Sequence, residues 1–131
     1  MDEKIAHLTF VQGVINRMAA NSFLVKGWTI ALVAALLAIA ADKMTLSYVV
    51  IILVPVLLFW WLDAFYLQQE TLYRKLYEVV ALKENKDIDF SMRTEGFKSQ
   101  IKSFKDIVLS KSVFPFYVVI LGLLIVMYIR A

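Results

Sequence analysis

The sequence predicts an all-α, polytopic membrane protein with three transmembrane helices and helical extensions on the cytoplasmic side. Of its 131 residues, 61% are hydrophobic and only 19% are charged, and the charges are grouped between three long apolar stretches. Apolar stretches of about 20 residues are typical of helices that cross a lipid bilayer. The polar segments between them carry helical periodicity, and the length allows one compact unit.

The first predicted element is a cytoplasmic or interfacial amphipathic helix over residues 2–22, which continues into the first span, 23–41. Nineteen residues in that span would cover roughly 28 Å, close to the ~30 Å hydrocarbon core. The amphipathic part is expected to pack at the membrane surface or on another helix; alternatively, its polar side lines a subunit contact or a gate. Its apolar side chains recur at helical spacing: Ile5, Leu8, Val11, Ile15 and Met18.

The second span, 46–67, is predicted to run on as a helix over 68–82, because no Gly or Pro follows Pro55 before residue 83. Asp63 is the only charge in this span. A helix that projects beyond the membrane must bury its apolar stripe. The partner is the N-terminal helix, the segment 97–109 or another copy of the chain. The stripe consists of Leu72, Leu76, Val79 and Leu82.

Residues 68–112 form the predicted cytoplasmic segment between the second and third spans. Within it, 83–95 is the most polar stretch; it is compatible with a loop or a short strand, and it is the best place for a hinge. Residues 97–109 are predicted to form a basic amphipathic helix, because apolar and lysine side chains follow neighbouring helical stripes. The third span, 113–129, completes the chain.

The distribution of Lys and Arg predicts the orientation in the membrane. Twelve of the fourteen lie in the N-terminal segment, at the start of the first span or in residues 68–112. Only Lys43 and Arg130 fall on the other side. Cytoplasmic loops are enriched in Lys and Arg, so the N-terminus is predicted in the cytoplasm and the C-terminus outside, in a multi-pass protein of the plasma membrane.

Two ionisable residues, Lys26 and Asp63, lie within the predicted spans. A charge at the centre of the bilayer costs about 2.5–3.5 kcal/mol on insertion scales, so both need partners or water. In an antiparallel hairpin they would fall at similar depth and could pair, with Arg17 as the alternative partner for Asp63. The pair either fixes the register of the hairpin or, in an assembly of several copies, contributes to a gate.

Small side chains form a stripe in the first span: Gly27, Ala31, Ala34, Ala35, Ala38 and Ala41. Such patterns let membrane helices approach closely. The contact lies within the chain or between copies, and a homo-oligomer is favoured.

Candidate contacts for an anionic ligand or for lipid headgroups are Arg93, Lys98, Lys102 and Lys105. The alternatives are lipid-surface binding or packing within the chain, a subunit interface, and recognition of a nucleotide or oligonucleotide signal. No cofactor or metal is expected, because the chain has no cysteine and one histidine, His7. No catalytic residue is predicted, so we expect no enzyme.

Two stretches of the chain resemble a recurring pattern in small bacterial inner-membrane proteins. They are residues 7–28 (HLTFVQGVINRMAANSFLVKGW) and 58–77 (LFWWLDAFYLQQETLYRKLY). The layout is also similar to that of the SLATT-like membrane effectors of antiviral defence. The resemblance implies an oligomer that forms a channel or disrupts the membrane when a cytoplasmic protein or a nucleotide-type signal binds. The alternative is a non-enzymatic membrane anchor or assembly subunit that recruits a soluble partner.

Overall fold

The computed structural model describes residues 2–40 and 45–130, and helices are its regular elements. The predicted all-α class is therefore confirmed. Ala41, the last predicted residue of the first span, and Lys43 lie outside the described residues. The elements are α1 (Asp2–Ala40), α2 (Leu46–Ala81), the 3-10 helices η2 (Asn85–Asp87) and η3 (Glu95–Gln100), α3 (Phe104–Val108) and α4 (Phe114–Arg130).

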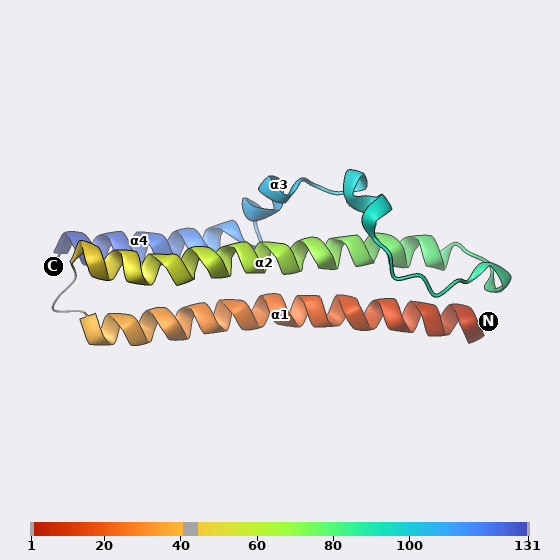
Figure 1. Cartoon of the computed structure of the whole chain (residues 1–131), viewed down its shortest axis with the longest axis horizontal. Helices are drawn as coiled ribbons and strands as arrows, with labels where there is room; N and C mark the ends of the chain where they lie inside the picture. Colours follow the sequence, from red (N-terminus) through yellow and green to blue (C-terminus); the bar gives the residue numbers. More distant parts are fainter. Residues whose placement is uncertain (1, 41–44, 131) are drawn as a thin grey trace.

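The two long helices, α1 and α2, form an antiparallel hairpin that sets the shape of the molecule (Figure 1). α1 has 39 residues and α2 has 36, so at 1.5 Å per residue they are about 58 and 54 Å long. Each is nearly twice as long as the ~30 Å hydrocarbon core is thick. The predicted continuity of each span with its neighbouring polar helix is therefore present in the structure.

Both long helices are long and apolar enough to cross a membrane, whereas α4, with 17 residues, is a shorter apolar helix. The composition of α1 and α2 is consistent with a membrane location. α4 lies beside the first half of α2 (Figure 1). The Tyr117 hydroxyl of α4 donates a hydrogen bond to the carbonyl oxygen of Phe59 at 3.3 Å, and its ring stacks on Trp60 with centroids 5.7 Å apart.

Two apolar clusters hold the hairpin together, one toward each end. The cluster nearer the N-terminus of α1 contains four buried side chains from the two long helices: Val11, Ile15, Leu76 and Val80. The other cluster adds α3 and α4 to the hairpin, and its buried members are Val33, Ile52, Val56, Ala64, Ile107, Val113, Tyr117, Ile120 and Leu124. α2 is therefore the central helix, with α1 on one side and the C-terminal elements on another.

The segment predicted as one basic helix, 97–109, is divided in the structure, so that prediction is wrong. η3 ends at Gln100, residues 101–103 are not helical, and α3 begins at Phe104. The Ser103 side chain caps α3 by accepting a hydrogen bond from the backbone N–H of Asp106 at 3.3 Å. Phe97 packs on the N-terminal cluster, whereas Phe104 packs on the other. The break between η3 and α3 lets Phe97 and Phe104 pack on different clusters.

We predict that Leu76→Ala destabilises the end of the hairpin that contains the N-terminus of α1. Leu76 is 4% exposed and packs in the N-terminal cluster, and truncating such a side chain costs about 2–5 kcal/mol. Leu82→Ala is the matched control, because Leu82 is 88% exposed and its loss should stay within about 0.5 kcal/mol. Thermal unfolding in detergent micelles measures both changes. Equal destabilisation by the two variants would contradict the packing described.

Candidate functional site

Three polar side chains meet between α1 and α2, in the stretch that separates the two apolar clusters. Nζ of Lys26 lies 2.6 Å from Oδ2 of Asp63 and 3.2 Å from Oγ of Ser22. The Ser22 hydroxyl donates a hydrogen bond to Oδ1 of the same carboxylate. The Asp63 side chain is fully buried, and 23% of the Lys26 side chain is exposed. We call these three residues the charge cluster.

Helical spacing explains how the charge cluster forms. Ser22 and Lys26 are four residues apart, so they share one face of α1, and the antiparallel hairpin brings Asp63 opposite them. Taking an ion out of water costs several kcal/mol, so a buried carboxylate at Asp63 requires partners for its oxygens. Both oxygens have one. The cluster is therefore suited to holding the hairpin in register.

Arg17, the alternative partner predicted for Asp63, does not join the charge cluster. It is exposed on α1, and it makes no ion pair with any residue in 2–40 or 45–130. The hairpin geometry thus brings Lys26 and Asp63 together and leaves Arg17 at the surface. Ser22 was not predicted from the sequence as a member of this cluster. Its position one turn before Lys26 was the signal that could have found it.

We predict that Lys26→Met destabilises the protein by about 3–5 kcal/mol, because it leaves the buried carboxylate of Asp63 without its cation. The double variant Lys26→Met with Asp63→Leu should recover most of that loss, since apolar side chains often replace a buried ion pair at little cost. Thermal unfolding in detergent micelles compares the variants. If the double variant is as unstable as Lys26→Met, burial of an unpaired charge is not the cause.

A second group of contacts ties the start of α1 to the segment after α2; we call it the N-terminal clasp. The Asn85 amide nitrogen donates to Oε2 of Glu3 at 2.6 Å, and its side-chain oxygen accepts from the backbone N–H of Lys4 at 3.1 Å. N–H groups in the first turn of a helix have no acceptor within the helix. Asn85, which is 81 positions from Lys4, therefore caps α1 from a distance.

His7 is the buried part of the N-terminal clasp. Its Nε2 donates to the carbonyl oxygen of Ser91 at 2.8 Å, and its ring lies 5.6 Å from that of Phe90. Phe90 has a φ of 54°, which is unusual for a bulky residue. From the sequence, His7 was considered only as a metal ligand, and a single histidine is too few for a metal site. Its position four residues before Val11 puts it on the buried face of α1, and that spacing was the available signal.

We predict that the Glu3 carboxyl titrates below its ordinary pKa of 4.5, because the Asn85 amide hydrogen bond stabilises the ionised form. Because the pKa is lowered in the folded chain, this contact is complete at neutral pH and is lost as the pH falls below 4.5. An NMR titration of the Glu3 carboxyl carbon measures the midpoint. In Asn85→Ala the midpoint should rise toward 4.5; an unchanged midpoint would show that Asn85 is not the cause.

The four candidate contacts for an anionic ligand lie on different elements of the segment after α2. Lys98 lies in η3, Lys105 lies in α3, and Arg93 lies in the non-helical stretch before η3; all three are exposed. Lys102 lines a cavity together with Lys75 of α2, a residue that sequence analysis did not select. Lys102 therefore shares a cavity with a second lysine.

The described residues contain no group of three or more His, Asp or Glu side chains that could hold a metal ion. Comparisons with protein-family models, with curated proteins and with solved structures found no match. The function is therefore inferred from the chemistry and geometry of the chain itself.

Proposed function

We propose that this protein is a homo-oligomeric membrane effector that forms a channel or disrupts the bilayer, and that the outward face of α1 is the contact between copies. One observation carries the proposal. α1 packs along α2, and among the described residues the side chains on its opposite face are mostly exposed. Such a face, with small side chains along its centre, fits a second helix.

The centre of the outward face is a line of small residues at intervals of seven: Gly13, Ala20, Gly27 and Ala34. All four are exposed, and on a helix they lie opposite the buried Val11 and Val33. A Cβ atom added at Gly13 or Gly27 would meet nothing within 4 Å. Packing within the chain therefore gives no reason for small residues here.

An interval of seven residues suits contact between helices that wind around each other. An α-helix has 3.6 residues per turn, so residues seven apart do not lie exactly above one another but shift slowly around the helix. Two helices that stay in contact along such a pattern must therefore wind around each other in a left-handed supercoil. In lipid, where no hydrophobic force drives helices together, small residues support association by allowing close approach. Gly27 and Ala34 lie in the predicted span, so these two properties support a contact between α1 helices there, which Gly13 and Ala20 would extend on the cytoplasmic side.

In the proposed arrangement α1, α2 and α4 all cross the bacterial inner membrane, with the N-terminus in the cytoplasm and the C-terminus outside. The excess of Lys and Arg in the N-terminal segment and residues 68–112 supports this orientation. The N-terminal clasp, the N-terminal half of α1 and the C-terminal half of α2 then lie in the cytoplasm. Control comes from that side, through a partner protein or a nucleotide-type ligand.

Each protomer contributes a rigid hairpin and an exposed charge to the proposed channel. The Lys26–Asp63 pair keeps α1 and α2 in register, and Arg17, exposed on the cytoplasmic half of α1, would contribute its charge to a gate formed by several copies. Within the bilayer the outward face of α1 is apolar. An apolar constriction closes a pore by excluding water, so the assembly would be closed at rest. The layout, similar to SLATT-like effectors, supports a role in antiviral defence.

We predict that Gly27→Leu abolishes the oligomer and membrane depolarisation, because a large side chain on the outward face of α1 keeps the helices apart. Gly122→Leu is the matched control: Gly122 is exposed on α4, and its added Cβ also meets nothing within 4 Å. Chemical cross-linking in membranes reports the oligomer, and a potential-sensitive dye reports depolarisation in cells that overexpress each variant.

The proposal requires the Gly122→Leu variant to behave as wild type in both measurements. It is wrong if wild-type protein is monomeric in membranes, or if Gly27→Leu still cross-links and depolarises the cells.

The second candidate is a non-enzymatic anchor or assembly subunit, and a groove at the cytoplasmic end favours it. The groove, about 450 Å³ in volume, lies between α1 and α2 and is lined by apolar and amide side chains. Leu8 and Tyr77 supply apolar surface, and Gln12 and Asn16 supply hydrogen-bonding groups. Purification in detergent of a stoichiometric soluble partner, from cells whose membrane potential is unchanged, would favour the anchor.

A further inference from the structure

A cavity of about 360 Å³ lies where α2 meets η3, α3 and the segment that leads into α4. Its volume is within the range of small-molecule sites, which is about 300–1,000 Å³. α2 contributes Leu67 and Lys75, and the chain after η3 contributes Lys102, Ile107 and Ser110. The cavity thus has an apolar side and a side that carries ammonium and hydroxyl groups.

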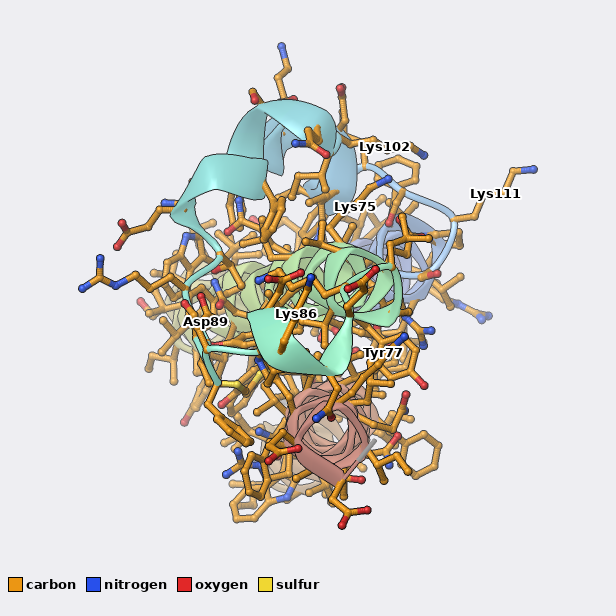
Figure 2. All side chains as sticks on the ribbon, turned by 90° about the vertical axis from the view of Figure 1, so that its right-hand side faces the viewer. Lys75, Tyr77, Lys86, Asp89, Lys102 and Lys111 are labelled. Carbon is orange, nitrogen blue, oxygen red and sulfur yellow. The ribbon has the colours of Figure 1, made fainter. Side chains whose placement is uncertain are left out.

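The polar side of the cavity suits an anion. Lys75 and Lys102 both line it, and none of its described lining residues is acidic. Figure 2 shows these two lysines on the same side of the molecule, with α1 on the opposite side. Lys75 pairs with Glu78, whose Oε2 lies 3.7 Å from Nζ of Lys75, and both side chains of this pair are exposed. Such surface pairs are weak, so they do not withhold the lysine from a ligand.

A hydroxyl group in the cavity lacks a partner. Oγ of Ser110 is buried and makes no hydrogen bond with any described residue. Buried polar groups are nearly always paired, and an unpaired one points to a missing partner. The Thr71 hydroxyl, which also lines the cavity, already donates to the carbonyl oxygen of Leu67 at 2.9 Å. Ser112 also lines the cavity but is exposed, so Ser110 is the buried hydroxyl that a ligand oxygen would satisfy.

The apolar side of the cavity indicates the source of the anion. Leu67 and Ile107 lie on this side, and Leu67 is the last residue of the predicted second span. On α2, Trp61 stacks on Phe65 with centroids 5.7 Å apart, and Trp61 also lies 6.1 Å from Phe104 of α3. Aromatic side chains collect at the level of lipid headgroups. A ligand with a phosphate and acyl chains would meet both sides of the cavity.

We infer that this cavity binds the phosphate of an anionic phospholipid. Lys75, Lys102 and the Ser110 hydroxyl contact the phosphate, and the acyl chains follow the apolar side toward Leu67. Lysine is a strong point-charge ligand for phosphate, and a bound lipid would link α2 to the chain before α4. The inference rests on the proposed membrane placement of α2 and α4 and is independent of oligomer formation.

The test is lipid binding by the full chain in neutral detergent, measured by native mass spectrometry with phosphatidylglycerol or phosphatidylcholine. Wild type should bind one phosphatidylglycerol per chain saturably, and about tenfold more tightly than phosphatidylcholine. Lys75→Gln and Lys102→Gln should each weaken phosphatidylglycerol binding about tenfold, and Ser110→Ala should weaken it less. Lys98→Gln is the matched control, because it removes the same charge from η3 and should leave binding unchanged.

Three outcomes would overturn the inference. Equal weakening by Lys98→Gln would show general charge attraction, and wild-type affinity in both Lys75→Gln and Lys102→Gln would place the lipid elsewhere. Inorganic phosphate that displaces the lipid at equal concentration would identify a free anion as the ligand. The Gly27→Leu variant separates this test from the proposed function, because it should lose the oligomer and still bind phosphatidylglycerol.

Discussion

The antiparallel register of α1 and α2 is the constraint on which the other contacts depend, and the buried pair of Lys26 and Asp63 sets it. Apolar side chains in a long hairpin tolerate a shift of one turn, about 5.4 Å, if another apolar residue replaces each of them. A buried carboxylate does not, because a shift would separate Asp63 from both of its partners. The pair thus supplies specificity of register, whereas the two apolar clusters supply most of the stabilising burial.

Once the register is set, α2 becomes the helix that α1, η3, α3 and α4 all contact. α1 covers one side, and η3, α3 and α4 pack on another. The chain between α2 and α4 returns along the hairpin, and Asn85 and Ser91 fasten its first part to the start of α1 (Figure 1). In this arrangement the far side of α1 is exposed, with no helix of the described residues packed on it. The uncovered face is the physical basis of the proposed assembly.

Features that depend on local pattern were predictable from the sequence. The continuity of α1 and α2 followed from uninterrupted helix-forming residues, and the Lys26–Asp63 pair followed from matching depth in a hairpin. The sequence also left open whether the small residues of the first span face the chain or another copy. The structure places Gly27 and Ala34 on the exposed side, and only a folded hairpin could show this.

Features that depend on contacts between distant segments were not predictable. Asn85 caps α1 from beyond α2, and no local pattern marks it as a helix cap. The helix expected over 97–109 has the correct periodicity, yet it breaks before Ser103 because its two ends pack on different clusters. Lys75 belongs by sequence to a surface helix. Only the return of residues 100–112 along α2 places it beside Lys102.

The most direct test of the account is a single-cysteine scan along the exposed side of α1. The chain contains no cysteine, so each introduced thiol can form a disulfide only with the same residue of another copy. In native membranes, cross-linking should peak when the cysteine replaces Gly13, Ala20, Gly27 or Ala34, and it should fall at the positions between them. Uniform or absent cross-linking along α1, or stronger cross-linking at Gly122→Cys on α4, would contradict the account.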